Sequence, residues 1–279
     1  LGFKEVSFTH AGAKILNKLF NEMTPVFNKM SKHDLTQANS VDLMDRVDSK
    51  FIFLASELHE ILNQCMESYS LLEIMNENLF EYKNTYFDSP KYHFYLTHHN
   101  KKLNRKKVRI RSYVSSEKHF LEIKQKTNKG RTIKVREEIT EINRNAVSHN
   151  RQFLREEGVE NCECLEPKQY CNYHRFSLMD NSSTERLTFD LGTNYNCSGS
   201  GSYDTPGNNR NFSLGNIVIA ELKQSKLERQ STFYKVMREK GYRPNGFSKY
   251  CMGIALSRDV VLKSNRFKRN MLKIQQEVQ

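Results

Sequence analysis

Five short runs of this sequence alternate charged or polar residues with apolar ones. They are VRIRSY at 108–113, HFLEIKQK at 119–126, TIKVREE at 132–138, ERLTFD at 185–190 and IVIAELKQ at 217–224. Side chains two residues apart on a β-strand point to the same side of the sheet. Each run therefore predicts a strand with one charged and one apolar face. Asn128-Lys129-Gly130, between the second and third runs, is typical of an antiparallel turn.

The charged faces of these strands predict a barrel with a charged interior. Their members are Arg109 and Arg111, Glu122 and Lys124, Lys134 and Arg136, Arg186 and Asp190, and Glu221 and Lys223. A single strand of this kind commonly turns its charged face to water. Because the pattern recurs on five strands, and helices with apolar stripes can cover the other face, we expect the charged faces to meet across a shared interior. The predicted fold class is α+β, a closed antiparallel eight-stranded β-tunnel with surrounding helices.

Helices are predicted at both ends of the chain. Apolar residues at three- and four-residue steps indicate an N-terminal helix over 11–30 that ends near Pro25. The segment 257–279 is basic and is expected to be a C-terminal helix. No break in composition separates a second domain, so 1–279 is predicted as a single domain with its core at about 40–256.

The charge balance indicates a polyanionic partner. Lys and Arg total 44 against 32 Asp and Glu, a net charge of +12 over 279 residues. Cations on facing strands repel one another in a low dielectric, and a row of phosphates between them removes that repulsion. Carboxylates on the same faces need a divalent metal between themselves and phosphate. The basic C-terminal residues are more typical of a solvated helix face, with peripheral contact to an anionic membrane or an acidic partner as the alternative. They are Lys263, Arg266, Lys268, Arg269 and Lys273.

Several other functions are not expected. No run approaches the roughly 18 apolar residues of a membrane span, and no signal-peptide pattern opens the chain, so a cytoplasmic location is expected. The six cysteines are then reduced thiols, since Cys162, Cys164 and Cys171 lack a fourth ligand at zinc spacing. The adjacent His98 and His99 cannot face one metal from a helix and are interpreted as surface or packing residues. No nucleic-acid-binding module is recognisable, and the sequence indicates no oligomeric state.

An ordered set of segments resembles a known family. The segments are DRVDSKF, YFDSPKYHFYLTHHNKKLNRKKVRIRSY, FLEIKQKTNKGRTIKVR, YHRFSL, ERLTFD, IVIAELKQ and FSKY. In this order they resemble VTC domains, the polyphosphate polymerase branch of the triphosphate tunnel metalloenzymes in the CYTH-like superfamily, over roughly 40 to 256. The resemblance implies transfer of the γ-phosphate of ATP onto a polyphosphate chain inside the tunnel, assisted by Mn²⁺ or Mg²⁺. ATP and polyphosphate are then the expected partners.

The same resemblance implies roles for individual residues. The positions that match catalytic residues are Lys50, Arg109, Arg111, Lys124, Arg175 and Lys249. Those that match substrate-binding residues are Lys134, Arg136, Tyr173, Arg186, Lys223 and Ser248. Glu221 resembles the carboxylate that holds the metal.

One departure from the wider superfamily favours transfer over hydrolysis. Triphosphatase and adenylate cyclase relatives open with Glu-x-Glu-x-Lys, in which both glutamates bind metal, whereas this chain has Arg46, Asp48 and Lys50. Attack by a metal-activated water should suffer from this change. Two alternatives remain open: an inorganic or nucleoside triphosphatase, and a non-catalytic sensor of polyphosphate or inositol phosphates.

Overall fold

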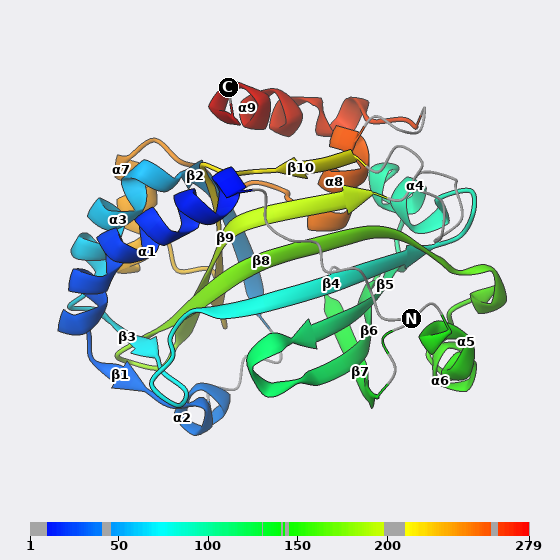
Figure 1. Cartoon of the computed structure of the whole chain (residues 1–279), viewed down its shortest axis with the longest axis horizontal. Coiled ribbons are helices and arrows are strands. Elements are labelled where there is room, and N and C mark those ends of the chain that lie inside the picture. The colour runs from blue at the N-terminus through cyan, green and yellow to red at the C-terminus, as the bar shows by residue number, and fades with distance from the viewer. Residues whose placement is uncertain are drawn as a thin grey trace.

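The architecture is an antiparallel sheet with helices packed around it (Figure 1). The computed structural model describes residues 10–40, 46–129, 131–140, 142, 145–197, 210–257 and 262–278. The main path of the sheet runs β2 (Val47–Leu54), β11 (Ile217–Gln224), β9 (Glu185–Cys197), β8 (Glu166–Asp180), β4 (Phe80–Asp88), β5 (Arg105–Tyr113), β6 (Lys118–Lys126) and β7 (Thr132–Ile139). Every neighbouring pair on this path is antiparallel. The predicted set of eight antiparallel strands is confirmed.

Three short strands extend the sheet beyond this path. β3 (Tyr69–Leu72) pairs with β8, β1 (Lys32–His33) pairs with β3 in parallel, and β10 (Arg210–Ser213) pairs with β9. The two ends of the main path are β2 and β7, and within the described residues no backbone ladder joins them. Among the described residues, backbone pairing therefore does not close the sheet into the predicted barrel, and the approach of its two sides comes from the curl of the sheet.

Turn residues set the register of the hairpins. β5 and β6 are joined through the 3₁₀ turn Val114–Ser116, with Glu117 in the left-handed region at φ 52°. The pairing that follows sets Arg109 opposite Glu122. Between β8 and β9, the Asp180 carboxylate accepts hydrogen bonds from the backbone N–H groups of Thr184 and Glu185, as an Asx-type turn does.

Three apolar clusters hold the helices to the sheet. In the first, α1 (His10–Lys29), α3 (Leu58–Cys65) and α7 (Thr232–Glu239) pack on β2, β11 and β9. In the second, α4 (His93–His99), α8 (Lys249–Ser257) and α9 (Lys268–Val278) pack together with the sheet. In the third, α5 (Ala146–His149) and α6 (Arg151–Glu156) cover β5 and β6. Each large apolar side chain buried this way contributes about 1.5–3 kcal/mol relative to an exposed one. A further short helix, α2, spans Leu35–Ser40.

The helix α8 lies directly on β8 and β9, and a glycine permits this close packing. A Cβ atom built at Gly253 would lie 2.7 Å from Cδ1 of Tyr195 and would collide with the side chain of Gln169. Both partners are buried, and the amide of Gln169 donates to the Tyr250 carbonyl oxygen at 3.2 Å. Only a residue without a side chain fits between the helix and the sheet here.

The predicted N-terminal helix over 11–30 corresponds to α1, His10–Lys29, but the expectation that it would end near Pro25 was wrong. The burial of Val26 and Phe27 outweighs the hydrogen bond that the proline cannot donate. The C-terminal helix predicted over 257–279 is instead α8 ending at Ser257, a 3₁₀ turn at Asn265–Phe267, and α9. Residues 258–261 lie outside the described residues.

Of the predictions about the burial of individual side chains, some were correct and others were wrong. Val108 and Ile123 are buried as expected, but Ile133 is 52% exposed because β7 ends the main path. Lys273, assigned to a solvated face, donates to the Ile52 carbonyl oxygen at 3.1 Å. The packing interpretation of His99 is confirmed: its ring is buried against Phe267. No helix in the described parts of the chain is both long and apolar enough to cross a membrane.

Candidate functional site

The predicted site residues lie on one side of the sheet, which we call the inner face. Direct Cα partners share a face, and the pairs are Lys50 with Glu221, Lys223 with Arg186, Arg175 with Asp190, Arg109 with Glu122, and Lys124 with Lys134. Arg111, Tyr173 and Arg136 belong to the same face by alternation along β5, β8 and β7. Lys249, in the first turn of α8, reaches the inner face and contacts Asp190 there.

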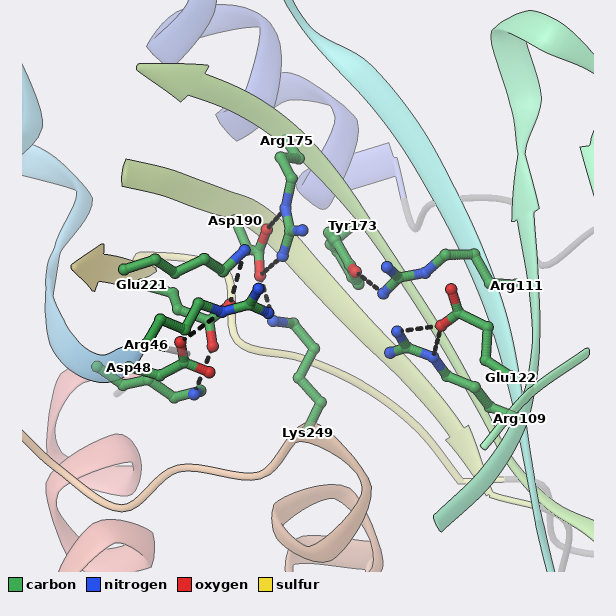
Figure 2. A network of polar contacts seen from close by, with 12 residues as sticks. Arg46, Asp48, Arg109, Arg111, Glu122, Tyr173, Arg175, Asp190, Glu221 and Lys249 are labelled. Atoms are coloured by element: carbon green, nitrogen blue, oxygen red, sulfur yellow. Dashed lines mark hydrogen bonds and ion pairs between the residues drawn. The ribbon is translucent and has the colours of Figure 1, made fainter. Parts of the chain in front are cut away.

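The sheet curls until opposite parts of the inner face approach each other. β6 and β11 are five strand steps apart on the main path, which would be roughly 24 Å in a flat sheet. The lowered pKa of Lys124 on β6 nevertheless responds to Glu221 and Lys223 on β11. Lys50 on β2 likewise lowers the pKa of Lys107 on β5, also five steps away. Figure 2 shows the two sides, with Arg109, Arg111 and Glu122 opposite Arg175, Asp190 and Glu221. The prediction that the charged faces meet is confirmed.

Glu122 is the buried anchor of one side. Its side chain is 0% exposed, and its carboxylate accepts hydrogen bonds from Nε and Nη2 of Arg109 at 2.8 and 2.5 Å. Lys134 Nζ lies 2.6 Å from the other carboxylate oxygen. Burial alone would raise the pKa of Glu122, but Arg109, Arg111 and Lys134 outweigh it and hold the pKa below its usual value. The carboxylate therefore stays ionised and fixes two cations.

On the opposite side of the inner face, the carboxylates of Asp190 and Glu221 each contact two cations. Asp190 accepts from Nε and Nη2 of Arg175 at 2.5 and 2.8 Å and also from Lys249. Against burial, these two cations hold the pKa of Asp190 at about 2. Glu221 lies 2.5 Å from Lys50 Nζ and 3.7 Å from Lys223 Nζ.

Other cations on the inner face have no carboxylate partner within the described residues. Arg111 donates only to neutral oxygens, Asn84 Oδ1 at 3.0 Å and Tyr173 OH at 2.7 Å. Lys124 makes no ion pair or hydrogen bond in the described structure, and its pKa is lowered well below the usual value by burial first and then by Arg109. Arg186 is similar, with its pKa lowered by burial and then by Arg46. An anion entering this space would relieve the repulsion among them.

Three remaining side chains complete the comparison with the sequence. Arg136 is exposed and lies over the ring of Phe120, with Cζ 4.5 Å from its centroid. Ser248 Oγ accepts a hydrogen bond from Lys107 Nζ at 2.8 Å. Lys107 was not among the predicted site residues, although alternation with Arg109 and Arg111 places it on the same face. Counting two residues back along β5 would have found it.

The described residues contain no group of three or more His, Cys, Asp and Glu side chains that could hold a metal by themselves. Arg46 donates to Asp48 Oδ1 at 3.0 Å, so the two positions that carry metal-binding glutamates in other superfamily members form an ion pair here. Mg²⁺ is commonly held by one or two carboxylates together with substrate phosphates. Glu221, 15% exposed and facing the inner space, fits the protein's share of such a site.

The lowered pKa of Lys124 predicts a pH dependence of anion binding. Because the pKa is depressed, Lys124 loses its proton at a lower pH than an ordinary lysine, and its attraction for phosphate disappears as the pH rises through that lowered value. We expect the affinity for tripolyphosphate, measured by calorimetry, to fall as the pH rises, and to do so at a lower pH than the titration of an ordinary lysine would cause. Lys124→Arg, which stays charged, should flatten that fall.

Lys118 provides the matched control, since it is an exposed lysine on the same strand. Lys118→Arg should keep the wild-type pH profile. A profile that Lys124→Arg leaves unchanged would show that this lysine does not sense the bound anion.

The family model of the VTC domain matches residues 45–258. The chain belongs to the VTC domain family. The match covers β2 through α8, the elements that carry the inner face of this VTC domain. The helix α1 and the helix α9 lie outside the matched segment.

Solved structures similar to this VTC domain include one from Bacillus halodurans and one from Hippeastrum. One, from Bacillus halodurans and provisionally named an adenylate cyclase, is 12% identical, with 74% of this chain and 96% of that chain covered and a TM-score of 0.48. The other, from Hippeastrum, is provisionally named an adenylyl cyclase and described as having a dominant triphosphatase activity. It is 16% identical, with 75% and 95% covered and a TM-score of 0.48. A comparison with curated proteins found no match.

Proposed function

We propose that this VTC domain transfers the γ-phosphate of ATP onto the end of a polyphosphate chain held on its inner face. The observation that carries the proposal is the set of inner-face cations without carboxylate partners among the described residues, Arg111, Lys124 and Arg186. Unpaired cations facing one another in a low dielectric are unfavourable. They become favourable when phosphates accept charge-assisted hydrogen bonds from them. The cytoplasm, where ATP is available, is the proposed location.

The reaction needs positioning and charge neutralisation more than covalent chemistry. A terminal phosphate oxygen of the chain attacks the γ-phosphorus of ATP in line, the bond from that phosphorus to the β–γ bridging oxygen breaks, and ADP leaves. The attacking oxygen is already anionic, so no protein base is required. The transition state is loose, with charge on the equatorial oxygens. In this proposal Arg111, Arg175 and Lys249 neutralise that charge, and the contacts of Asp190 with Arg175 and Lys249 support it.

Glu221 is the proposed protein ligand of Mn²⁺ or Mg²⁺, with phosphate oxygens supplying other ligands. The metal would neutralise the repulsion between this carboxylate and the substrate phosphates. Lys50 and Lys223 hold the carboxylate of Glu221 in place from β2 and β11. Because Arg46 and Asp48 pair with each other, the described residues offer no second set of carboxylate ligands for activating water beside Glu221. That favours phosphate over water as the attacking group.

The test is an incubation of the purified chain with ATP and Mn²⁺. We expect a ladder of long polymer on a gel, with one ADP formed for each phosphate added, and we expect chelation by EDTA to abolish it. Arg269→Ala, which changes an exposed arginine on α9, should keep full activity. Phosphate released without polymer would instead assign a triphosphatase. Tight polyphosphate binding without turnover would assign a sensor.

A further inference from the structure

The inner face changes character along its strands. At one end, inner-face residues are apolar and lie beneath α8: Ile52, Tyr195 and Ile219 belong to the same cluster as Tyr250 and Ile254 of that helix. Tyr86, near the end of β4, stacks on Tyr250 with ring centroids 5.3 Å apart. This end of the inner face is therefore covered by the helix.

The opposite end of the inner face carries three aromatic rings, and two of them, Tyr113 and Phe120, belong to none of the three apolar clusters of the described residues. Tyr82 on β4 is the Cα partner of Tyr113 on β5, and Phe120 on β6 is the partner of Arg111. The three rings form one group, since Tyr113 contacts Tyr82 at 5.1 Å and Phe120 at 5.7 Å in edge geometry. We call Tyr113, Phe120 and Arg136 the aromatic mouth.

The rings of this group are not equivalent. Tyr82 stacks on Tyr173 at 5.4 Å and also lies beneath the guanidinium groups of Arg111 and Arg175, so its faces are occupied within the protein. Tyr113 and Phe120 are only half-buried, and Arg136 is exposed. The guanidinium of Arg136 lies 4.5 Å over the Phe120 ring. The mouth thus presents flat, partly exposed π surfaces and a cationic plane.

We propose that the aromatic mouth binds the purine base of the nucleotide. The inference rests on the proposed function, because it assigns one end of the same substrate. Bases stack on aromatic rings and on arginine planes. Tyr113 is two residues from Arg111 on β5, roughly 7 Å along the strand. A base on these rings therefore directs the phosphates onto the guanidinium of Arg111, which has no carboxylate partner among the described residues. The nucleotide therefore enters at the end away from α8.

The chemistry of this subsite also sets its selectivity. Stacking recognises the face of a base and not the hydrogen-bonding groups at its edge. ATP and GTP should therefore bind with similar affinity, and tripolyphosphate, which has no base, should bind more weakly than either. A site made only of lysines and arginines would not bind ATP more tightly than tripolyphosphate.

The test compares ATP with tripolyphosphate on ring variants by calorimetry. Phe120→Leu and Tyr113→Leu are each expected to weaken ATP binding about 10-fold, as loss of a stacking ring does, and to leave tripolyphosphate binding unchanged. Unchanged tripolyphosphate binding also shows that the variants are folded. Phe153→Leu, at a partly buried ring on α6, is the matched control and should change neither affinity.

A spectroscopic variant gives an independent readout. The chain contains no tryptophan, so Phe120→Trp introduces a single indole at the mouth. ATP should quench its fluorescence and tripolyphosphate should not. Suppose that the wild-type protein binds both ligands and that the ring variants weaken both affinities equally or leave both unchanged. The proposed base subsite is then wrong, whereas the proposed function still stands. If wild-type protein binds neither ligand, the proposed function itself fails.

Discussion

Polymer synthesis by Arg111→Ala is expected to be about 10²–10³-fold slower than in the unchanged chain, a loss on the order of 3–4 kcal/mol of transition-state stabilisation. Arg111 is held by Asn84 and Tyr173, and within the described residues it has no carboxylate to neutralise. Its charge is therefore available to phosphate. For the same reason its removal leaves no buried carboxylate unpaired, so the variant should remain folded.

Initial rates of ADP formation and gel analysis of the polymer measure this effect. Arg111→Lys keeps the charge but loses the two-pronged geometry of the guanidinium, and it should fall between the wild type and the alanine variant. Arg269→Ala again serves as the control for loss of an arginine charge from the surface. Unchanged synthesis by Arg111→Ala would remove the central argument for phosphoryl transfer on the inner face.

Glu122→Ala is expected to destabilise the fold by about 3–5 kcal/mol, since removing one partner of a buried ion pair leaves an uncompensated charge. Glu122 has no exposed side-chain surface and holds Arg109 and Lys134. Without it, Arg109 faces Arg111 and Lys124 with no carboxylate between them. The free energy of unfolding, from urea titration, is the quantity to measure.

The matched control lies on the neighbouring strand. Glu138 and Lys118 form an exposed ion pair at 3.9 Å, and Glu138→Ala should cost no more than about 1 kcal/mol. Polyphosphate should restore part of the stability lost in Glu122→Ala, because its phosphates supply the missing negative charge and bind the folded state. Equal midpoints for Glu122→Ala and the wild type would mean that the buried network contributes nothing to folding.

The local geometry of strands explains what the sequence could predict. Two-residue alternation placed Arg109, Glu122 and Glu221 on one face, because the direction of a side chain on a strand depends only on its own backbone. The same rule would have included Lys107. Helix limits were less predictable: α1 passes through Pro25 because tertiary burial of the following turn overrides the local preference.

The partners of the charged side chains could not be predicted in this way. Asp190 binds Arg175, 15 residues earlier, and Lys249, 59 residues later. The first contact needs the β8–β9 register, and the second needs α8 to lie across the inner face. Alternation along one strand encodes neither the register of a hairpin nor the placement of a helix. The roles of these residues in the reaction remain predictions for the experiments above.

The close packing at Gly253 makes the activity of this domain sensitive to a residue that has no side chain and no chemical role of its own. Lys249 lies one helical turn before Gly253, so the clearance between α8 and the sheet determines how far its ammonium group projects toward Asp190. Even a methyl group at position 253 would push α8 away from the sheet and displace the turn that carries Lys249. A Gly253→Ala variant would keep every charged side chain but would misplace the ammonium group of Lys249. Its loss of activity should therefore resemble that of a variant without Lys249.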